Sequence, residues 1–381
     1  MSNPLVKMLI WIVLGLGIGF IVSLLFFSPA PQTIPSVNLT QNLSNNSAPT
    51  AAFSQTMIIA PNCDVCNSID PVFSGLATYS SSTGITLEPV VKFDPTSSEG
   101  EALISRYSIA KLPVIILRPK GNISQTAFSD LIAAGFSKEN DGAVVLREIK
   151  VPYYEISSSK PVGFVSAIAI RPHSCLDCMD PQDYFTSLEQ DGINFYFSNK
   201  TVLDENDSIA RSLIQEYNIT KLPVLMLSSG ASYYPSFEFL TQIGTVEGEW
   251  FILRNVTPPY VDLSNNHSIV GNVQEILIVN SSCTTCFNAQ ELADYISTSA
   301  NLHIYNKSTY EANSSTASSL ILRYNITQIP TVLFSPDASV YISFSNSWLA
   351  QGSTRESDGW FVFRSHQLLN GTFYQNISVP S

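Results

Sequence analysis

The sequence has few charged residues, and those it has are unbalanced in sign. Asp, Glu, Lys and Arg make up 13% of its 381 residues, about half the fraction usual in globular proteins. No run of Lys or Arg occurs, and 31 acidic against 19 basic residues give a net charge of −12. Nucleic-acid binding requires clustered positive charge, so we exclude nucleic acid as a partner. Disorder is also excluded, because 45% of the residues are hydrophobic and 11% are aromatic.

Histidine is scarce, and no cysteine is left over from a pair. The four histidines show no spacing typical of metal ligands. The six cysteines form three C-x-x-C pairs, which are Cys63–Cys66, Cys175–Cys178 and Cys283–Cys286. Structural zinc sites usually place two such pairs about 15–20 residues apart, whereas these lie a domain apart. Zinc is therefore the least favoured interpretation, and we expect neither a metal nor another cofactor.

One hydrophobic run, residues 8–27, is long enough to cross a membrane. It has no charge, and at about 1.5 Å per residue it spans a hydrocarbon core of about 30 Å. It exceeds the ~7–15-residue core of a signal peptide, and no A-x-A site follows. We therefore favour an uncleaved anchor over a cleaved signal peptide. Lys7 is the only basic residue before the run, which predicts a cytoplasmic N-terminus.

These features predict a single-pass protein of the cell membrane with most of the chain outside. Residues 1–27 would form the cytoplasmic tip and anchor, and residues 28–50 a linker rich in Pro, Ser, Asn and Thr. Gly15 and Gly19 form a GxxxG pattern within the run. This pattern is typical of a self-association face, although ordinary transmembrane glycine is the simpler interpretation.

Sequons for N-glycosylation are frequent after the hydrophobic run, which fits a glycosylated exterior. The alternative is a composition rich in Asn, Ser and Thr that serves solubility alone, and both interpretations agree on the location. The fifteen candidate sites are Asn38, Asn42, Asn45, Asn122, Asn199, Asn206, Asn218, Asn255, Asn266, Asn280, Asn306, Asn313, Asn325, Asn370 and Asn376.

The rest of the chain contains three copies of one unit. Each C-x-x-C follows an apolar run typical of a strand, at residues 57–62, 167–172 and 276–281, and precedes a predicted helix, such as 287–300. Units of more than 100 residues can each bury their own core, so they are domains and not solenoid repeats. We place the domains at residues 51–160, 161–268 and 269–381.

Two further markers recur in every unit. The first is Tyr-x-Ile-x-x-(Leu/Ile)-Pro followed by an apolar strand, at residues 107–117, 217–227 and 324–334. The second is an acidic turn followed by an apolar run and an arginine, beginning at Asp141, Glu247 and Asp358. The constant spacing of these markers from the cysteines indicates a common fold for the three units.

Strand, C-x-x-C, helix, strand, helix, Leu/Ile-Pro and strand resembles the thioredoxin fold. The fold class implied is α/β, with three tandem thioredoxin-like domains after one transmembrane helix. The resemblance implies cis-prolines at Pro113, Pro223 and Pro330 that face the cysteines. With Leu112, Leu222 and Ile329, which precede them, they would offer an extended backbone edge to a substrate strand.

Two departures from thioredoxin stand out. The W-C-G-P-C sequence is absent, since Asp64-Val65, Leu176-Asp177 and Thr284-Thr285 separate the cysteines. The buried Asp that thioredoxin has six positions before its first cysteine is replaced by Met57, Ala169 and Leu277. The usual proton acceptor for the second thiol is therefore missing.

The resemblance implies an intra-pair disulfide in each unit and a thiol–disulfide exchange reaction. Cys63, Cys175 and Cys283 would attack as thiolates, and Cys66, Cys178 and Cys286 would resolve the mixed disulfide. We expect the first cysteine of each pair at a helix N-terminus, where the helix dipole lowers a thiol pKa. An acid inside the pair opposes this effect, so Asp64 and Asp177 favour Cys283–Cys286 as the most reactive pair. His173 would stabilise a thiolate at Cys175 or lie on the polar surface.

Two functions remain open. The first is an extracytoplasmic oxidoreductase that acts on protein thiols and disulfides and depends on an unknown membrane electron partner. The second is a glycosylated surface scaffold or adhesion protein whose disulfides are structural. A C-x-x-C disulfide closes a very short loop and therefore removes little conformational entropy from the unfolded chain. It stabilises a fold only slightly, which favours the oxidoreductase. A glycan on Asn280, beside Cys283, would favour the scaffold.

Overall fold

The computed structural model describes residues 51–190, 193–369 and 374–377. The predicted anchor and linker, Lys7, the Gly15/Gly19 pair and the sequons at Asn38, Asn42, Asn45 and Asn370 lie outside the described residues. Within the described part of the chain, no helix is long and apolar enough to cross a membrane.

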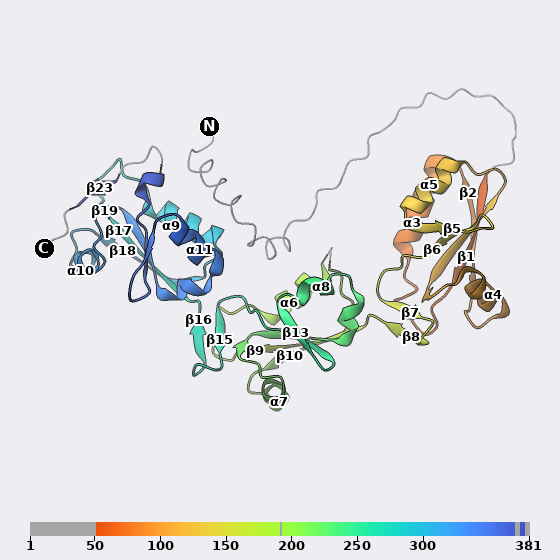
Figure 1. Cartoon of the computed structure of the whole chain (residues 1–381), viewed down its shortest axis with the longest axis horizontal. Helices are drawn as coiled ribbons and strands as arrows, with labels where there is room; N and C mark the ends of the chain where they lie inside the picture. Colours follow the sequence, from red (N-terminus) through yellow and green to blue (C-terminus); the bar gives the residue numbers. More distant parts are fainter. Residues whose placement is uncertain (1–50, 191–192, 370–373, 378–381) are drawn as a thin grey trace, which may run out of the picture.

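The described chain contains three five-stranded sheets, one after another along the sequence (Figure 1). The first set of elements is β1 Ala52–Ile58, α3 Asp70–Thr83, β2 Thr86–Phe93, α4 Ser98–Tyr107, β3 Lys111–Leu112, β4 Val114–Lys120, α5 Gln125–Ala133, β5 Phe136–Lys138, β6 Val144–Leu146, β7 Tyr153–Glu155 and β8 Lys160–Val162. Short apolar runs rich in β-branched residues form the strands, and amphipathic segments between them form the helices.

The second and third sets repeat the first. The second is β9 Val165–Arg171, α6 Pro181–Glu189, β10 Phe197–Asp204, α7 Ser208–Glu216, β11 Lys221–Leu222, β12 Val224–Ser228, the 3₁₀ turn η1 Ser229–Tyr233, α8 Phe237–Leu240, β13 Gly244–Glu247, β14 Trp250–Leu253, β15 Tyr260–Asp262 and β16 Ser268–Val270. The third is β17 Val273–Val279, α9 Ala289–Ser299, β18 Ile304–Glu311, α10 Ser315–Arg323, β19 Gln328–Ile329, β20 Thr331–Phe334, η2 Pro336–Val340, α11 Ile342–Ala350, β21 Thr354–Arg355, β22 Phe361–Val362, η3 His366–Leu368 and β23 Gln375–Asn376.

The strand order is the same in all three sheets. It is β2-β1-β4-β6-β5 in the first, β10-β9-β12-β14-β13 in the second and β18-β17-β20-β22-β21 in the third. The strand before each C-x-x-C pairs in parallel with the strand after the next helix, and antiparallel with the strand after the proline marker. This mixed sheet, with helices on both faces, is a thioredoxin-like arrangement, as the resemblance implied.

Each sheet separates two apolar cores. In the third sheet, one core gathers α9 and α11 residues such as Leu292, Phe344 and Trp348, and the other gathers Ile321 of α10 and Tyr324. In the first and third units, the helix that follows the cysteines shares its face of the sheet with a second helix, α5 or α11. Each of these second helices lies in the sequence between two strands of the same sheet. The sequence markers gave no signal for these inserted helices.

The two later markers of each unit bind one another. Arg147 donates from Nη2 to the carbonyl of Tyr107 and to Glu139, and Arg254 makes the same two bonds with Tyr217 and Glu247. In the third unit the corresponding bonds join Arg364 to Tyr324 and Glu356. Each arginine thereby satisfies a carbonyl at the end of a helix, which has no partner within the helix itself.

The joints between the units are short, and a glycine lies in each. Gly163 separates β8 from β9 with φ +84°, and Gly271 separates β16 from β17 with φ +98°. A Cβ at either position would collide with Val151 or Pro258. The hydroxyl of Tyr234 donates to the Gly163 carbonyl at 2.8 Å, and that of Tyr341 donates to Gly271 at 2.7 Å. The boundaries predicted near residues 160 and 268 fall inside β8 and β16, so the joints lie a few residues later.

We predict that Asp358→Asn weakens the third unit in a pH-dependent way. Burial alone would raise the pKa of Asp358, but hydrogen bonds from Tyr324 and the Trp360 amide, together with the charge of Arg323, hold it below its usual value. A lowered pKa means that the ionised carboxylate stabilises the fold above about pH 4 and that this stabilisation is lost as the pH falls further.

Hydrogen exchange of the α10 and β19 amides should therefore be faster in Asp358→Asn than in the parent at pH 6. The difference should shrink as the pH falls below about 4. The equivalent α7 and β11 amides of the second unit provide the control and should exchange alike in both proteins. A difference that stays constant from pH 6 to pH 3 would contradict the assigned role.

Candidate functional site

All three C-x-x-C pairs lie in loops that follow the first strand of each sheet. Cys63 and Cys66 precede α3, Cys175 and Cys178 precede α6, and Cys283 and Cys286 precede α9. The expectation that each first cysteine begins a helix is therefore wrong. Helices α3 and α6 carry a proline in their first turn, and the side chains of Asp180 and Asn288 cap α6 and α9. These residues fix the start of each helix after the second cysteine.

Each pair forms a disulfide, with S–S distances of 1.96, 2.10 and 2.01 Å in chain order. Their accessibility differs. Cys63 and Cys66 are 4% and 3% exposed and belong to the core of the first unit, whereas in the second pair Cys175 is 9% exposed and Cys178 is half-buried. Cys283 and Cys286 are both half-buried. The third disulfide is therefore the one that an incoming thiol reaches most easily.

The helices begin only after the second cysteine, and the donors found near sulfur come from the turn itself. In the first unit the Cys66 amide donates to Cys63 Sγ at 3.3 Å. In the third unit the Thr285 hydroxyl lies 3.9 Å from Cys283 Sγ. A hydroxyl that can rotate toward sulfur is a weak donor to a thiolate. The third pair thus combines access to solvent with a donor of its own.

The charged residues near the other two pairs have partners elsewhere. His173 is exposed and lies 3.4 Å from Asp204, so it pairs with that carboxylate. Asp177 is 3.7 Å from His303 of the third unit. Asp64 and Asp177 lie in the loops before the helices and not in a first helical turn.

Pro113, Pro223 and Pro330 all follow cis peptide bonds, and two further cis bonds precede Pro152 and Pro259. The edge beside the first three prolines is occupied by the chain itself. Strand β3 pairs with β7, β11 with β15 and β19 with β23, each in antiparallel register. The residue before each proline is thereby matched to a residue of the same chain: Leu112 to Tyr154, Leu222 to Val261 and Ile329 to Gln375.

The hydrogen bonds show which side of the strand is covered. The Ile156 amide donates to the Ala110 carbonyl at 3.0 Å, and Ile377 donates to Thr327 at 2.8 Å. Backbone groups two residues apart on a strand face the same way, so those of Leu112 and Ile329 also face the chain's own strand. The predicted open edge for a substrate strand at Leu112, Leu222 and Ile329 is therefore absent in this state.

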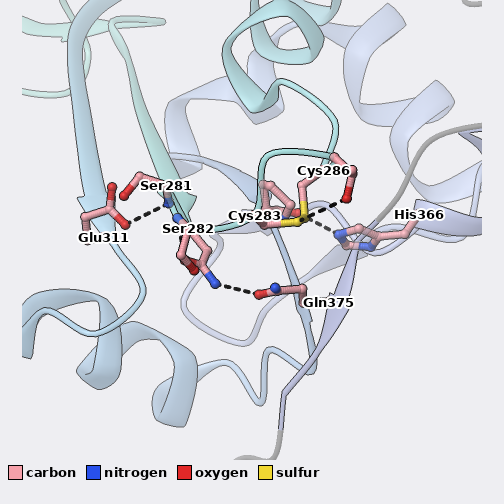
Figure 2. Close-up of a disulfide and its surroundings, with 10 residues drawn as sticks. Ser281, Ser282, Cys283, Cys286, Glu311, His366 and Gln375 are labelled. Atoms are coloured by element: carbon pink, nitrogen blue, oxygen red, sulfur yellow. Dashed lines mark hydrogen bonds between the residues drawn. A yellow bond between two sulfur atoms is a disulfide. The ribbon is translucent and has the colours of Figure 1, made fainter.

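The third C-x-x-C loop is tied to the strand that covers its proline (Figure 2). The side chain of Asn280 donates from Nδ2 to Gln375 Oε1 at 2.5 Å, and its Oδ1 accepts from the Ser282 amide at 3.1 Å. The Ser281 amide donates to Glu311 at 3.1 Å. Asn280 thus holds Cys283 and β23 together through the nitrogen atom that would carry a glycan.

Two buried ionisable residues near the third unit's first strand and proline were missed by the sequence patterns. His366 Nε2 lies 2.7 Å from the carbonyl of Pro330, and its ring points toward the disulfide in Figure 2. Glu275 on β17 is fully buried, 3.7 Å from Lys307. Burial raises the pKa of Glu275, and the charge of Lys307 opposes that shift. Both occur in only one of the three units, so the repeated features of the sequence do not point to them.

The positions where thioredoxin has its buried acid are apolar and buried here, as Met57, Ala169 and Leu277. Glu275 lies two residues before Leu277 on the same strand, farther from the cysteines. Across the described ranges, no group of three or more His, Cys, Asp or Glu side chains could hold a metal ion.

No protein-family model and no curated protein matches the chain. Solved structures similar to it include full-length ERdj5, human ERp44 and the NTD_N/C domain of the alkylhydroperoxide reductase AhpF from Enterococcus faecalis. ERdj5 is 10% identical and covers 74% of this chain with 41% of its own length, so the chain spans less than half of that protein. The TM-score is 0.16.

The other two comparisons are of the same kind. Human ERp44 is 10% identical, with coverage of 74% and 77% and a TM-score of 0.14. The AhpF domain is 16% identical, with coverage of 47% and 82% and a TM-score of 0.14. Such scores carry no argument about function. The thioredoxin-like assignment rests on the strand order, the C-x-x-C positions and the cis-prolines of this chain.

We predict that the three disulfides are reduced in the order of their exposure. Under limiting dithiothreitol, Cys283–Cys286 should open first and Cys63–Cys66 last, because an attacking thiolate must approach one sulfur along the S–S axis. Differential alkylation and peptide mass spectrometry at increasing reductant measure the order directly. Simultaneous opening of all three pairs, or opening of Cys63–Cys66 first, would contradict it.

Proposed function

We propose that the chain is a membrane-anchored, extracytoplasmic thiol–disulfide oxidoreductase with three tandem thioredoxin-like domains. The observation that carries the proposal is the half-buried Cys283–Cys286 disulfide, set in a thioredoxin-like sheet whose cis-proline, Pro330, is bonded to His366. A disulfide that solvent reaches exchanges with protein thiols far more readily than one inside a core. Its substrates are protein thiols and disulfides, and a membrane protein supplies or removes the electrons.

The location belongs to the same proposal. The run of residues 8–27 anchors the chain, and its Gly15/Gly19 pattern offers a face on which two such helices could pack. Everything after the run lies outside the cell membrane, where disulfides persist and sequons are glycosylated. The three disulfides and the abundant sequons support this placement.

We expect the third pair to account for most of the activity. Oxidative refolding of a reduced, unfolded protein, and reduction of insulin, should fall about ten-fold or more in Cys283→Ser, because the attacking thiolate is lost. The matched Cys63→Ser/Cys66→Ser variant should retain most of the activity, since that pair lies in the core. A Cys286→Ser variant should accumulate mixed disulfides through Cys283, and mass spectrometry would identify their partners.

Equal activity in the parent and in a variant with all six cysteines replaced by serine would overturn the oxidoreductase. A second candidate function would then apply. It is a glycosylated surface scaffold, and two observations favour it: Cys63 and Cys66 are buried in a core, and the chain's own strands cover the prolines.

Asn280 distinguishes the two candidates. Its Nδ2 donates to Gln375, and a glycan on that nitrogen would replace one of its two hydrogens, crowd this contact and stand beside Cys283. For an oxidoreductase we therefore expect Asn280 to be unmodified while exposed sequons such as Asn122 carry glycans. Deglycosylation in heavy-oxygen water followed by peptide mass spectrometry scores each site. High occupancy at Asn280 would favour the scaffold.

A further inference from the structure

His366 is a buried ionisable side chain beside the third cis-proline. It is 2% exposed and begins the short turn η3. Aromatic rings surround it, with centroid distances of 5.8 Å to Phe287, 5.1 Å to Phe363 and 5.3 Å to Tyr374. Phe287 directly follows Cys286, so the imidazole packs against the C-x-x-C loop itself. Figure 2 shows the ring directed at the disulfide.

Only one of the two ring nitrogens of His366 has a hydrogen-bond partner among the described residues. Nε2 lies 2.7 Å from the Pro330 carbonyl, and because a carbonyl only accepts, Nε2 carries a hydrogen. In the neutral ring Nδ1 is then a bare acceptor, and it has no hydrogen-bond partner among the residues that the structure describes. A buried acceptor without a donor costs free energy, so a purely structural role accounts poorly for this side chain.

The fold does not require a histidine here. Counting two residues on from the arginine that closes each unit, the corresponding positions are Ile149, Val256 and His366. Val256 is buried like His366, and Ile149 is half-buried. In the first two units an aliphatic side chain therefore occupies the position that His366 occupies in the third. The histidine occurs only in the unit whose disulfide is the most exposed.

Building on the redox function proposed above, we infer that His366 is the electrostatic partner of the Cys283 thiolate and takes up a proton when the disulfide is reduced. A dithiol donates two electrons and two protons, and its own sulfurs form a disulfide. The Cys283–Cys286 bond breaks, and one proton goes to the Cys286 thiol. The other goes to Nδ1 of His366, which leaves Cys283 as a thiolate beside an imidazolium.

The surroundings favour a neutral ring in the oxidised state and a charged ring in the reduced state. Burial lowers the pKa of His366, while backbone groups of Pro330 and Arg364 oppose that shift and the charge of Arg364 reinforces it. The titratable or charged groups in contact with the ring or shifting its pKa are Arg364 and Tyr374, and Cys286 precedes Phe287, whose ring packs on the imidazole. No carboxylate is bonded to the ring, so a thiolate is the negative charge that would retain the proton.

Two substitutions separate the charge of His366 from its packing. His366→Val reproduces the side chain of the second unit, and His366→Gln keeps a donor for Pro330 but cannot be charged. In the fully reduced protein, alkylation of Cys283 by iodoacetamide at pH 6 should be about ten-fold slower in both variants, the effect of roughly one pKa unit. At pH 9, where every thiol ionises, the parent and both variants should react alike. Cys63 and Cys175 serve as internal controls.

Two results would overturn the inference. One is labelling of Cys283 at pH 6 that equals the parent in both variants. The other is a deficit that persists at pH 9, which indicates altered access. Ring ¹³C and ¹⁵N shifts of His366 in the parent give a test that needs no variant: at pH 6.5 the ring should be neutral when oxidised and protonated when reduced. A ring that stays neutral in both states also overturns it. Thiol labelling does not measure turnover, so these results are separate from the activity tests of the proposed function.

Discussion

The strand before each cis-proline is only two residues long, and its backbone groups need a partner. The chain supplies one from its own sequence in every unit: β7 for β3, β15 for β11 and β23 for β19. In the first two units this partner is the first strand of a hairpin, and the second strand of that hairpin leads through a glycine into the next sheet. The backbone groups of the short strand before each proline need hydrogen-bond partners, and the strand that supplies them closes the edge at the proline. In the first two units that same strand begins the hairpin that leads into the next domain.

The same motif has different surroundings in the three units. Cys63 and Cys66 are part of an apolar core, and a disulfide there contributes to packing as much as to chemistry. Cys283 and Cys286 are half-buried, and the loop that carries them is bonded to β23 through Asn280. The cover of the third proline is therefore a short strand held partly by side chains of the loop it covers. The Asn280–Gln375 bond is thus a direct link between the C-x-x-C loop and that strand.

The features that could be predicted from the sequence are those that recur. The cysteine pairs, the apolar strands and the Leu/Ile-Pro marker appear three times at constant spacing, and they define the sheet. The late start of the cysteine helices was also encoded: Pro71 and Pro181 are residues typical of a first helical turn. What could not be predicted depends on contacts between distant segments. The closure of the proline edge joins residues about 40 positions apart, and His366 meets Pro330 across 36 positions. An alignment of the three units at the closing arginine would have isolated His366 as the odd residue.

The joints determine how the three disulfides act together. Phe164 follows the first joint glycine yet packs against the core of the first unit, while Val151 packs against the core of the second. Only Gly163 and Phe164 lie between β8 and β9, so the backbone connection between these two units is short. A short connection with shared side chains limits how far the C-x-x-C pair of one unit can approach that of the next. A partner that engages two units therefore gains avidity where its own binding sites match the spacing that these joints set.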